Sequence, residues 1–203
     1  LAAWVRREAA RLLESRFDAV ASVEAVSISL FPAVAIEGRG LRLDRRDRPE
    51  KVPLVVVREF RASGSPWSLL RRRVDAVDVT GLELHVAKGV ESAPSTGRGR
   101  MPRDVTVGRV HVMDGLLLVL PNDSRKLPLR FLLRDVTVHD FRFDAPMRYD
   151  ATLVNPRPEG TVRSQGQFGP WNPREPRRTP LSGAFTLERA KLSTFKGIDG
   201  VPV

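Results

Sequence analysis

A short pattern of alternating apolar and polar residues occurs three times between residues 74 and 143. Each copy has a Val-x-Val pair, a break at Gly or Asp, and then further large apolar residues. Alternation with a period of two gives each strand one apolar face, so neighbouring copies predict a sheet with a continuous apolar face. The apolar positions in the three copies are Val77, Val79, Leu82 and Leu84; Val110, Val112, Leu116, Leu118 and Leu120; and Val136, Val138, Phe141 and Phe143.

The same alternation precedes the three copies. The apolar residues occupy even-numbered positions before Gly38-Arg39-Gly40 and odd-numbered positions after it. Glycines at such a change of parity indicate a β-bulge. Further strands are predicted over residues 53–62, 147–153, 162–168 and 181–187. The apolar positions before the repeats that we expect on the same face are Val26, Ile28, Leu30, Ile36, Leu41 and Leu43.

Two segments have helical patterns. Apolar residues recur every three to four positions over residues 1–17, which predicts an amphipathic helix within an N-terminal segment 1–22. Ser65 followed by Pro66 is typical of a helix start, and arginines follow at positions 71 and 72. Trp67, in this short inserted helix, is expected either to anchor the helix to the sheet or to lie near a lipid interface.

These elements predict a mainly β protein with about ten strands. Because most connections are short, and because parallel pairing needs a long crossover, we expect a curved antiparallel β-sheet meander over residues 23–203. Two short helices cannot cover such a sheet. Either the sheet closes around a side-chain core, or its apolar face remains an open groove that needs a ligand or partner.

Charge and composition narrow the possible partners. The net charge of +10 suggests an anionic partner, but nearly all the cations are arginines dispersed among acidic residues. Aromatic residues make up only 6% of the chain, too few for a surface on which bases stack, so we expect no nucleic acid partner. The sequence has no run of 18 apolar residues that would span a bilayer.

The sequence shows no recognisable catalytic or metal-binding motif. His85, His111 and His139 each follow an apolar strand residue, so we expect them on the polar face of the sheet. The chain has no cysteine, no HExxH, no G-x-S-x-G and no phosphate-binding loop. We therefore expect a protein that is not an enzyme and has no cofactor and no metal.

The order of these segments resembles the N-terminal module of AsmA-like proteins. The most specific part comprises the first helix and then the segments 23–32, 40–43, 53–57, 67–70 and 77–84, with the sequences VEAVSISLFP, GLRL, PLVVV, WSLL and VDVTGLEL. The later segments TLVNP, GQFGPW and LSTFKGI, over 152–156, 166–171 and 192–198, are also similar to AsmA-like proteins. The resemblance covers nearly the whole chain.

The resemblance implies a setting and a function. AsmA-like proteins are anchored in the inner membrane, face the periplasm, and are related to chorein-type bridge proteins built from repeating β-groove units. The resemblance therefore favours the open groove, with phospholipid acyl chains as its ligand and outer-membrane assembly or lipid homeostasis as its role. An anchoring helix is expected before Leu1-Ala2-Ala3-Trp4, and the β module is expected to be truncated at its C-terminus. The alternative is a non-catalytic envelope scaffold with a closed β core that binds a protein partner.

Overall fold

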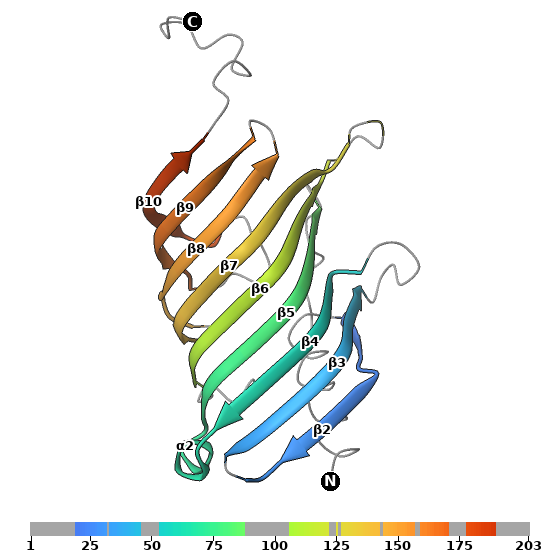
Figure 1. The fold of residues 1–203 in the computed structure, drawn as a ribbon, viewed down its shortest axis with the longest axis vertical. Coiled ribbons are helices and arrows are strands. Elements are labelled where there is room, and N and C mark those ends of the chain that lie inside the picture. The colour runs from blue at the N-terminus through green and yellow to red at the C-terminus, as the bar shows by residue number, and fades with distance from the viewer. Residues whose placement is uncertain are drawn as a thin grey trace, which may run out of the picture.

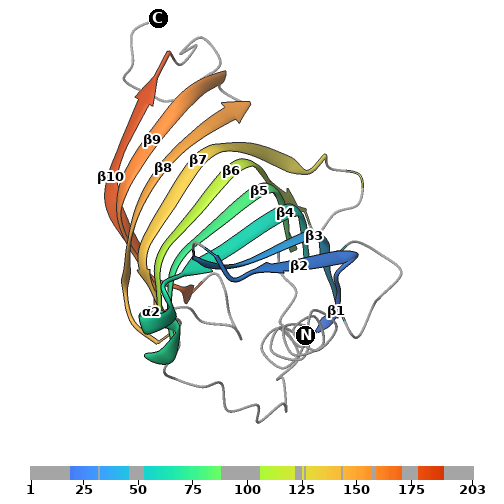
Figure 2. The same ribbon diagram turned by 60° about the horizontal axis from the view of Figure 1, so that its bottom comes forward.

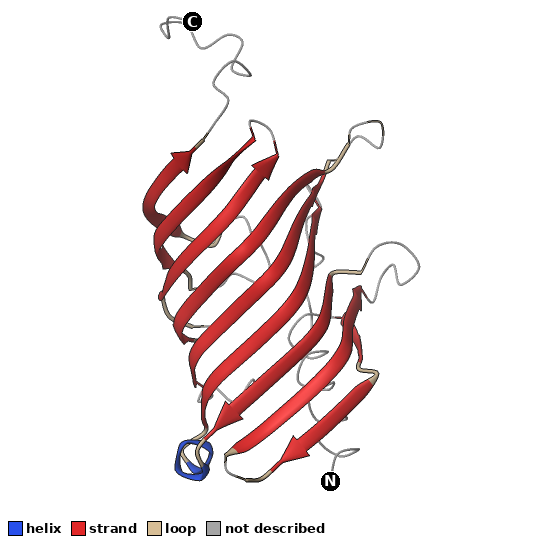
Figure 3. Ribbon diagram, viewed as in Figure 1, coloured by secondary structure: helices blue, strands red, loops and turns tan. Residues whose placement is uncertain are grey.

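The chain folds into one curved sheet of ten strands (Figure 1). The computed structural model describes residues 19–31, 33–45, 53–87, 106–121, 125, 127–142, 144–156, 159–170 and 178–189. Within these ranges nearly all regular structure is strand, and the one helix is short (Figure 3). The prediction of a mainly β protein with an open, curved sheet is confirmed.

The strands follow one another across the sheet in nearly sequential order. The order is β1-β3-β4-β5-β6-β7-β8-β9-β10, and β2 also pairs with β3. The elements are β1 (Ala19–Ser22), β2 (Ala25–Ser29), β3 (Val34–Arg45), β4 (Val55–Gly64), α2 (Pro66–Leu70), β5 (Arg73–Ala87), β6 (Thr106–Leu120), β7 (Leu129–Phe141), β8 (Met147–Pro156), β9 (Glu159–Phe168) and β10 (Leu181–Glu188).

The sheet is mixed, so the prediction of a purely antiparallel meander is wrong at one place. Strands β5 and β6 pair in parallel, with Arg73 opposite Thr106 and Ala87 opposite Leu120, whereas the other neighbours pair antiparallel. Strand β5 has 15 residues and spans ~50 Å. The segment 88–105 that joins the two strands can extend over ~60 Å, so it can return along β5 without a helical crossover. The loop predicted within this segment lies outside the described residues.

The N-terminal prediction needs a second correction. The helix predicted over residues 1–17 lies outside the described residues, but residues 19–22, at the end of the predicted segment 1–22, form strand β1. Strand β3 has 12 residues, so its edge has room for two short antiparallel partners. Strand β2 pairs with its first half and β1 with its second half, where Ala21 lies opposite Leu43.

A row of irregular residues crosses five strands. By the register on either side, Gly40, Arg58, Gly81, Asp114 and Arg134 lie opposite one another on β3 to β7. Gly40, Gly81 and Asp114 have positive φ values of 62°, 68° and 52°. Such a residue breaks the strict alternation of side chains, and because all five strands change together their pairing stays in register. The change of parity expected across Gly38-Arg39-Gly40 is part of this row, which we call the bulge row, but β3 and β4 stay in register there, so the β-bulge expected at these glycines is not formed.

The pairing with strand β8 shows on which face of the sheet the apolar side chains of β7 lie on either side of the bulge row. The register between β7 and β8 shifts by one residue between Leu133 and Asp135, so the row ends at this pair of strands. Tyr149, Ala151 and Leu153 alternate regularly along β8 and share one face. Because Leu133 pairs with Leu153, the apolar face continues across the bulge row on every strand that it crosses.

Helix α2 is capped by the residues predicted for that role and by one more distant carboxylate. The Ser68 N–H donates to Ser65 Oγ at 3.0 Å, which confirms Ser65 as the N-cap. The Ser65 N–H donates to Asp75 Oδ2 at 2.7 Å. Hydrogen bonds from the Ser68 hydroxyl and the Ser65 N–H lower the pKa of Asp75, because they favour its charged form.

We expect Asp75→Asn to destabilise the chain at neutral pH and to have a vanishing effect in acid. A carboxylate whose pKa is lowered by folding stabilises the folded state when the pH is above its pKa in the unfolded chain, which is about 3.9. This contribution is lost as the pH falls through its pKa in the folded state. Thermal melts of both proteins between pH 7 and pH 2 would measure the difference. Asp144→Asn, at an exposed carboxylate, is the matched control. A difference that does not shrink below pH 3 would contradict the assignment.

Candidate functional site: the apolar face of the sheet

One face of the sheet is apolar along its whole length. Register and alternation place on it thirteen of the residues that the sequence predicted there, and we call this surface the apolar face. These residues are Val26, Ile28, Ile36, Leu41, Leu43, Val77, Val79, Leu82, Leu84, Val110, Val112, Val136 and Val138. Leu43 and Val112 are buried, and most of the others are half-buried.

Three predicted residues lie on the opposite face. The parallel register places Leu117 beside Leu84 and Leu118 beside His85. Leu116, Leu118 and Leu120 therefore share a face with Glu83, His85 and Ala87, and the prediction that they join Leu82 and Leu84 is wrong. The cause is Asp114, whose positive φ changes the parity within β6. Leu117 and Val119 take their places on the apolar face.

Two further predicted residues are at the ends of strands. Leu30 follows β2 and is exposed in the turn to β3. Phe141 is the last residue of β7, opposite Val107, one residue beyond Asp140 with its positive φ of 50°. Phe143 lies outside the described residues. Leu30 and Phe141 therefore do not extend the apolar face across the middle of the sheet.

Sequence reasoning missed several residues of the apolar face. Residues 55–57 of strand β4 are all valine, so alternation alone could not separate its inward positions from the others. On β8 the alternation was recognised, but its apolar residues were not assigned to the same face as those of the other strands. The register now adds Val55, Val57, Phe60, Phe131, Leu133, Met147, Tyr149 and Leu153.

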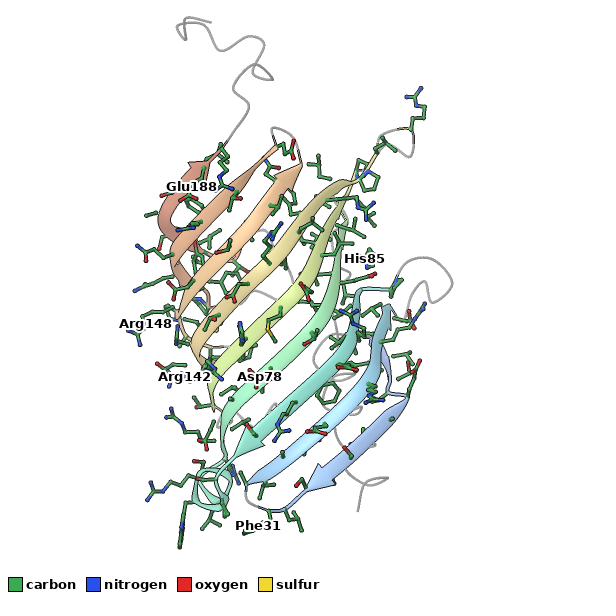
Figure 4. All side chains as sticks on the ribbon, viewed as in Figure 1. Phe31, Asp78, His85, Arg142, Arg148 and Glu188 are labelled. Carbon is green, nitrogen blue, oxygen red and sulfur yellow. The ribbon has the colours of Figure 1, made fainter. Side chains whose placement is uncertain are left out.

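The sheet is bent into a trough, and the apolar face is its hollow side. Figure 2 looks along the arch, which runs from β2 at one side to β10 at the other and stays open between them. Asp78, on the opposite face, is on the side that faces the viewer in Figure 4, which is the outer side of the arch. The eight strands from β3 to β10 give the trough a length of ~34 Å across the strands.

The outer face carries rows of ion pairs, and it is polar except for a patch on β6 to β8 that contains Leu116, Leu118, Leu120, Leu132 and Val154. Arg61 pairs with Glu37, and Arg39 Nε lies 3.6 Å from Glu59 Oε1. A depression over β2 to β5 is open to solvent, and its lining includes these four charged residues and Asp78. Exposed pairs of this kind each contribute at most ~1 kcal/mol. They keep this face soluble, and they form no enclosed pocket.

The three histidines lie on the outer face, as predicted, but in different environments. His111 lies between two carboxylates, with Nδ1 3.8 Å from Asp78 and Nε2 3.1 Å from Asp135. His139 Nε2 is 3.4 Å from Asp150. His85 is buried, and its Nδ1 makes no hydrogen bond to a described residue. Within the described ranges, no group of three or more metal-ligating side chains could hold an ion.

The apolar face contains one buried polar pair. The hydroxyls of Tyr149 on β8 and Ser164 on β9 are 2.7 Å apart and form a hydrogen bond. Both side chains are buried, so this bond satisfies groups that would otherwise face an apolar surface without a partner. The trough therefore stays apolar in character across β8 and β9.

No described element covers the apolar face. Every substantial contact between described elements joins neighbouring strands, apart from the contact of α2 with β5. A globular domain normally buries such a face against a second layer. The described part of the chain is thus a single layer whose hollow side requires a cover.

Comparisons with known proteins do not identify the chain. No protein-family model matches it, and no curated protein gives a significant match. Among the described residues, no helix has the length and apolar character needed to cross a membrane. What the fold and the site define is a class: the described residues form an open, single-layer, mixed β-sheet with an apolar hollow side and a largely polar outer side.

Proposed function

We propose that the apolar face binds the acyl chains of phospholipids and that the protein handles these lipids without catalysis. The observation that carries this proposal is that no described element covers the apolar face on the hollow side of the single-layer, open sheet. Apolar side chains from eight neighbouring strands line it continuously, and the bulge row keeps them on one side. A surface of this extent needs an apolar ligand or partner.

The dimensions of the trough suit an acyl chain. One leaflet of a bilayer contributes roughly half of a ~30 Å hydrocarbon core, so an extended chain spans ~15 Å. A trough of ~34 Å has room for such a chain in more than one position. Each buried CH₂ contributes ~0.8 kcal/mol, and the contacts have no preferred direction, so a lipid can shift along the trough. Head groups remain in water at its open side.

The cellular setting of this proposal comes from the resemblance to AsmA-like proteins. On the basis of this resemblance, we propose that the chain is part of a bacterial envelope protein. This protein would be anchored in the inner membrane by a helix outside this sequence and would face the periplasm. Its role there is to bind or channel phospholipid in support of outer-membrane assembly. The open, curved sheet supports this assignment because a groove of this kind is what the resemblance implies.

A second candidate function is that of an envelope scaffold whose apolar face binds a protein. Strand β10 favours it, because Leu181, Phe185 and Leu187 on its apolar side are exposed. The edge of β10 also lacks the usual protection of edge strands: its eight residues include no proline, and the single charge is the terminal Glu188. A strand from another polypeptide could extend the sheet there.

Native mass spectrometry distinguishes the two candidates. The chain, purified in mild detergent from a bacterial host, is expected to retain phospholipid, which extraction and lipid analysis would identify. Delipidation followed by incubation with phospholipids of increasing acyl length should give affinity that rises with each CH₂. A well-folded chain that is free of lipid and takes up none would contradict the lipid function. Such a result would leave the protein-binding scaffold as the remaining candidate.

A further inference from the structure

One end of the sheet carries four exposed large apolar side chains on two adjacent connections. Leu30 and Phe31, in the turn between β2 and β3, are 67% and 87% exposed, and Trp67 and Leu70 of α2 are 74% and 76% exposed. Val34 pairs with Gly64, so the turn and the helix lie side by side at this end. We call these four residues the apolar tip. Figures 1 and 2 show α2 beside the turn after β2, and Figure 4 shows Phe31 at the extreme end of the sheet.

The exposure of Trp67 is unexpected for a packing residue. The expectation that Trp67 anchors α2 to the sheet is wrong, because three quarters of its surface is accessible. The helix is instead held by the Ser65 cap and by its contact with β5. The indole is therefore available for an external partner.

Arginines surround the apolar tip. Arg71, Arg72 and Arg73 follow α2 directly, and all three are exposed. The pairing of Arg73 with Thr106, and of Val107 with Phe141, brings Arg142 and Arg148 to the same end of the sheet. Arg73 and Arg148 share one carboxylate, Asp140, at 3.8 and 3.6 Å. At this end of β5 to β8, the described residues include five arginines and only three carboxylates, which are those of Asp75, Asp140 and Asp144.

We propose that this end of the sheet docks on the surface of an anionic lipid bilayer, with the apolar tip inserted at the level of the head groups. Tryptophan and phenylalanine favour the membrane–water interface, and leucine contributes apolar burial just below it. The excess of arginine matches the negative surface potential of anionic lipids, and arginine side chains reach head groups while their stems contact apolar surface. The excess of arginine over carboxylate beside exposed aromatic side chains favours an anionic bilayer as the occupant of this end of the sheet.

Vesicle co-sedimentation tests this docking. The chain is mixed with large vesicles of phosphatidylcholine containing phosphatidylglycerol, and with vesicles of phosphatidylcholine alone. We expect Phe31→Ser with Trp67→Ser to weaken partitioning onto the anionic vesicles by roughly tenfold or more. The matched control is Leu127→Ser with Leu132→Ser, which removes an exposed leucine before β7 and one on the outer face, both away from the apolar tip, and should leave binding unchanged.

Charge and depth provide independent readouts. Arg71→Gln with Arg142→Gln should weaken binding to anionic vesicles, and rising salt should do the same, because the Debye length falls from about 10 Å at 0.1 M to about 3 Å at 1 M. A chain with Trp4→Phe and Trp171→Phe keeps Trp67 as its one tryptophan. Its fluorescence should shift to the blue on anionic vesicles and be quenched by brominated acyl chains.

The outcomes separate docking from lipid binding in the trough. Docking predicts that the variants at the apolar tip lose vesicle binding but still co-purify with lipid, and that a variant on the apolar face behaves in the opposite way. Equal sedimentation of the native chain and the Phe31 and Trp67 double variant would overturn the proposal. So would binding that is indifferent to phosphatidylglycerol, or a Trp67 signal that is unaffected by vesicles.

Discussion

Leu84→Asp abolishes the co-purification of phospholipid, whereas Leu118→Asp leaves it intact: this is the result that we expect from the arrangement of the sheet. The two leucines are on neighbouring strands and both are half-buried. Leu84 lies on the apolar face between Val55 and Leu117, whereas Leu118 lies on the outer face beside His85 and Arg130. A carboxylate at position 84 would have to be desolvated by an acyl chain, which costs several kcal/mol. At position 118 the carboxylate would lie on the outer face, away from the acyl chain and opposite Arg130.

The comparison is informative because the two substitutions are chemically identical. Lipid extracted per mole of folded protein should fall at least tenfold for Leu84→Asp and stay near the native value for Leu118→Asp. Circular dichroism and thermal melts would establish that both variants are folded. If Leu84→Asp fails to fold, Leu84→Asn adds a polar group without the charge and should still reduce the lipid content. Equal lipid retention by the two Asp variants would contradict the assignment of the hollow side as the lipid site.

Gly81→Val should destabilise the fold by about 2–4 kcal/mol. The φ of +68° at Gly81 belongs to the left-handed region, which β-branched residues adopt at high cost. A Cβ at this position would also lie 2.9 Å from the Cβ of Arg58 and 2.7 Å from its Nε, so the neighbouring strand would have to move. For a chain of this size the loss corresponds to a fall in melting temperature of roughly 5–15 °C. Differential scanning calorimetry or a urea titration would measure it.

Asp114→Gly is the matched control within the bulge row. Asp114 already adopts a φ of 52°, and glycine accepts this conformation freely. Glycine relieves the strain of the positive φ, which stabilises the folded state, but it also raises the conformational entropy of the unfolded chain, which destabilises the folded state. We therefore expect the free energy of unfolding to change by no more than about 1 kcal/mol. If Gly81→Val is tolerated as well as Asp114→Gly, then positive φ values in the bulge row do not limit the stability of the sheet.

Much of the secondary structure could be predicted from local sequence. Alternation located the strands because a period of two is a property of each strand by itself, and Ser65 with Pro66 marked the start of α2 because capping involves only neighbouring residues. The parity change at Gly38-Arg39-Gly40 was recognised because glycine signals a positive φ. The corresponding change at Asp114 was missed, because aspartate adopts this conformation less often and carries no comparable signal.

That one omission explains the error on β6. If the even-numbered positions of β6 stayed on one face throughout, Leu116, Leu118 and Leu120 would share the apolar face with Val110 and Val112, and this was the prediction. The register with β5 assigns the face to Leu117 instead, since Leu117 lies opposite Leu84. Five consecutive apolar residues over 116–120 satisfy either parity, so the choice depends on the neighbouring strands and not on β6 itself.

The sequence by itself determined that the chain builds a mainly β protein of about ten strands with one apolar and one charged side, because these are properties of each strand and its turns. The tertiary structure decided the pairing: the parallel register of β5 and β6, the alignment of five irregular residues in the bulge row, and the single open layer. It also decided that Trp67 is exposed beside Phe31. These features depend on which strands lie next to each other over long sequence separations, and local patterns carry no information about that.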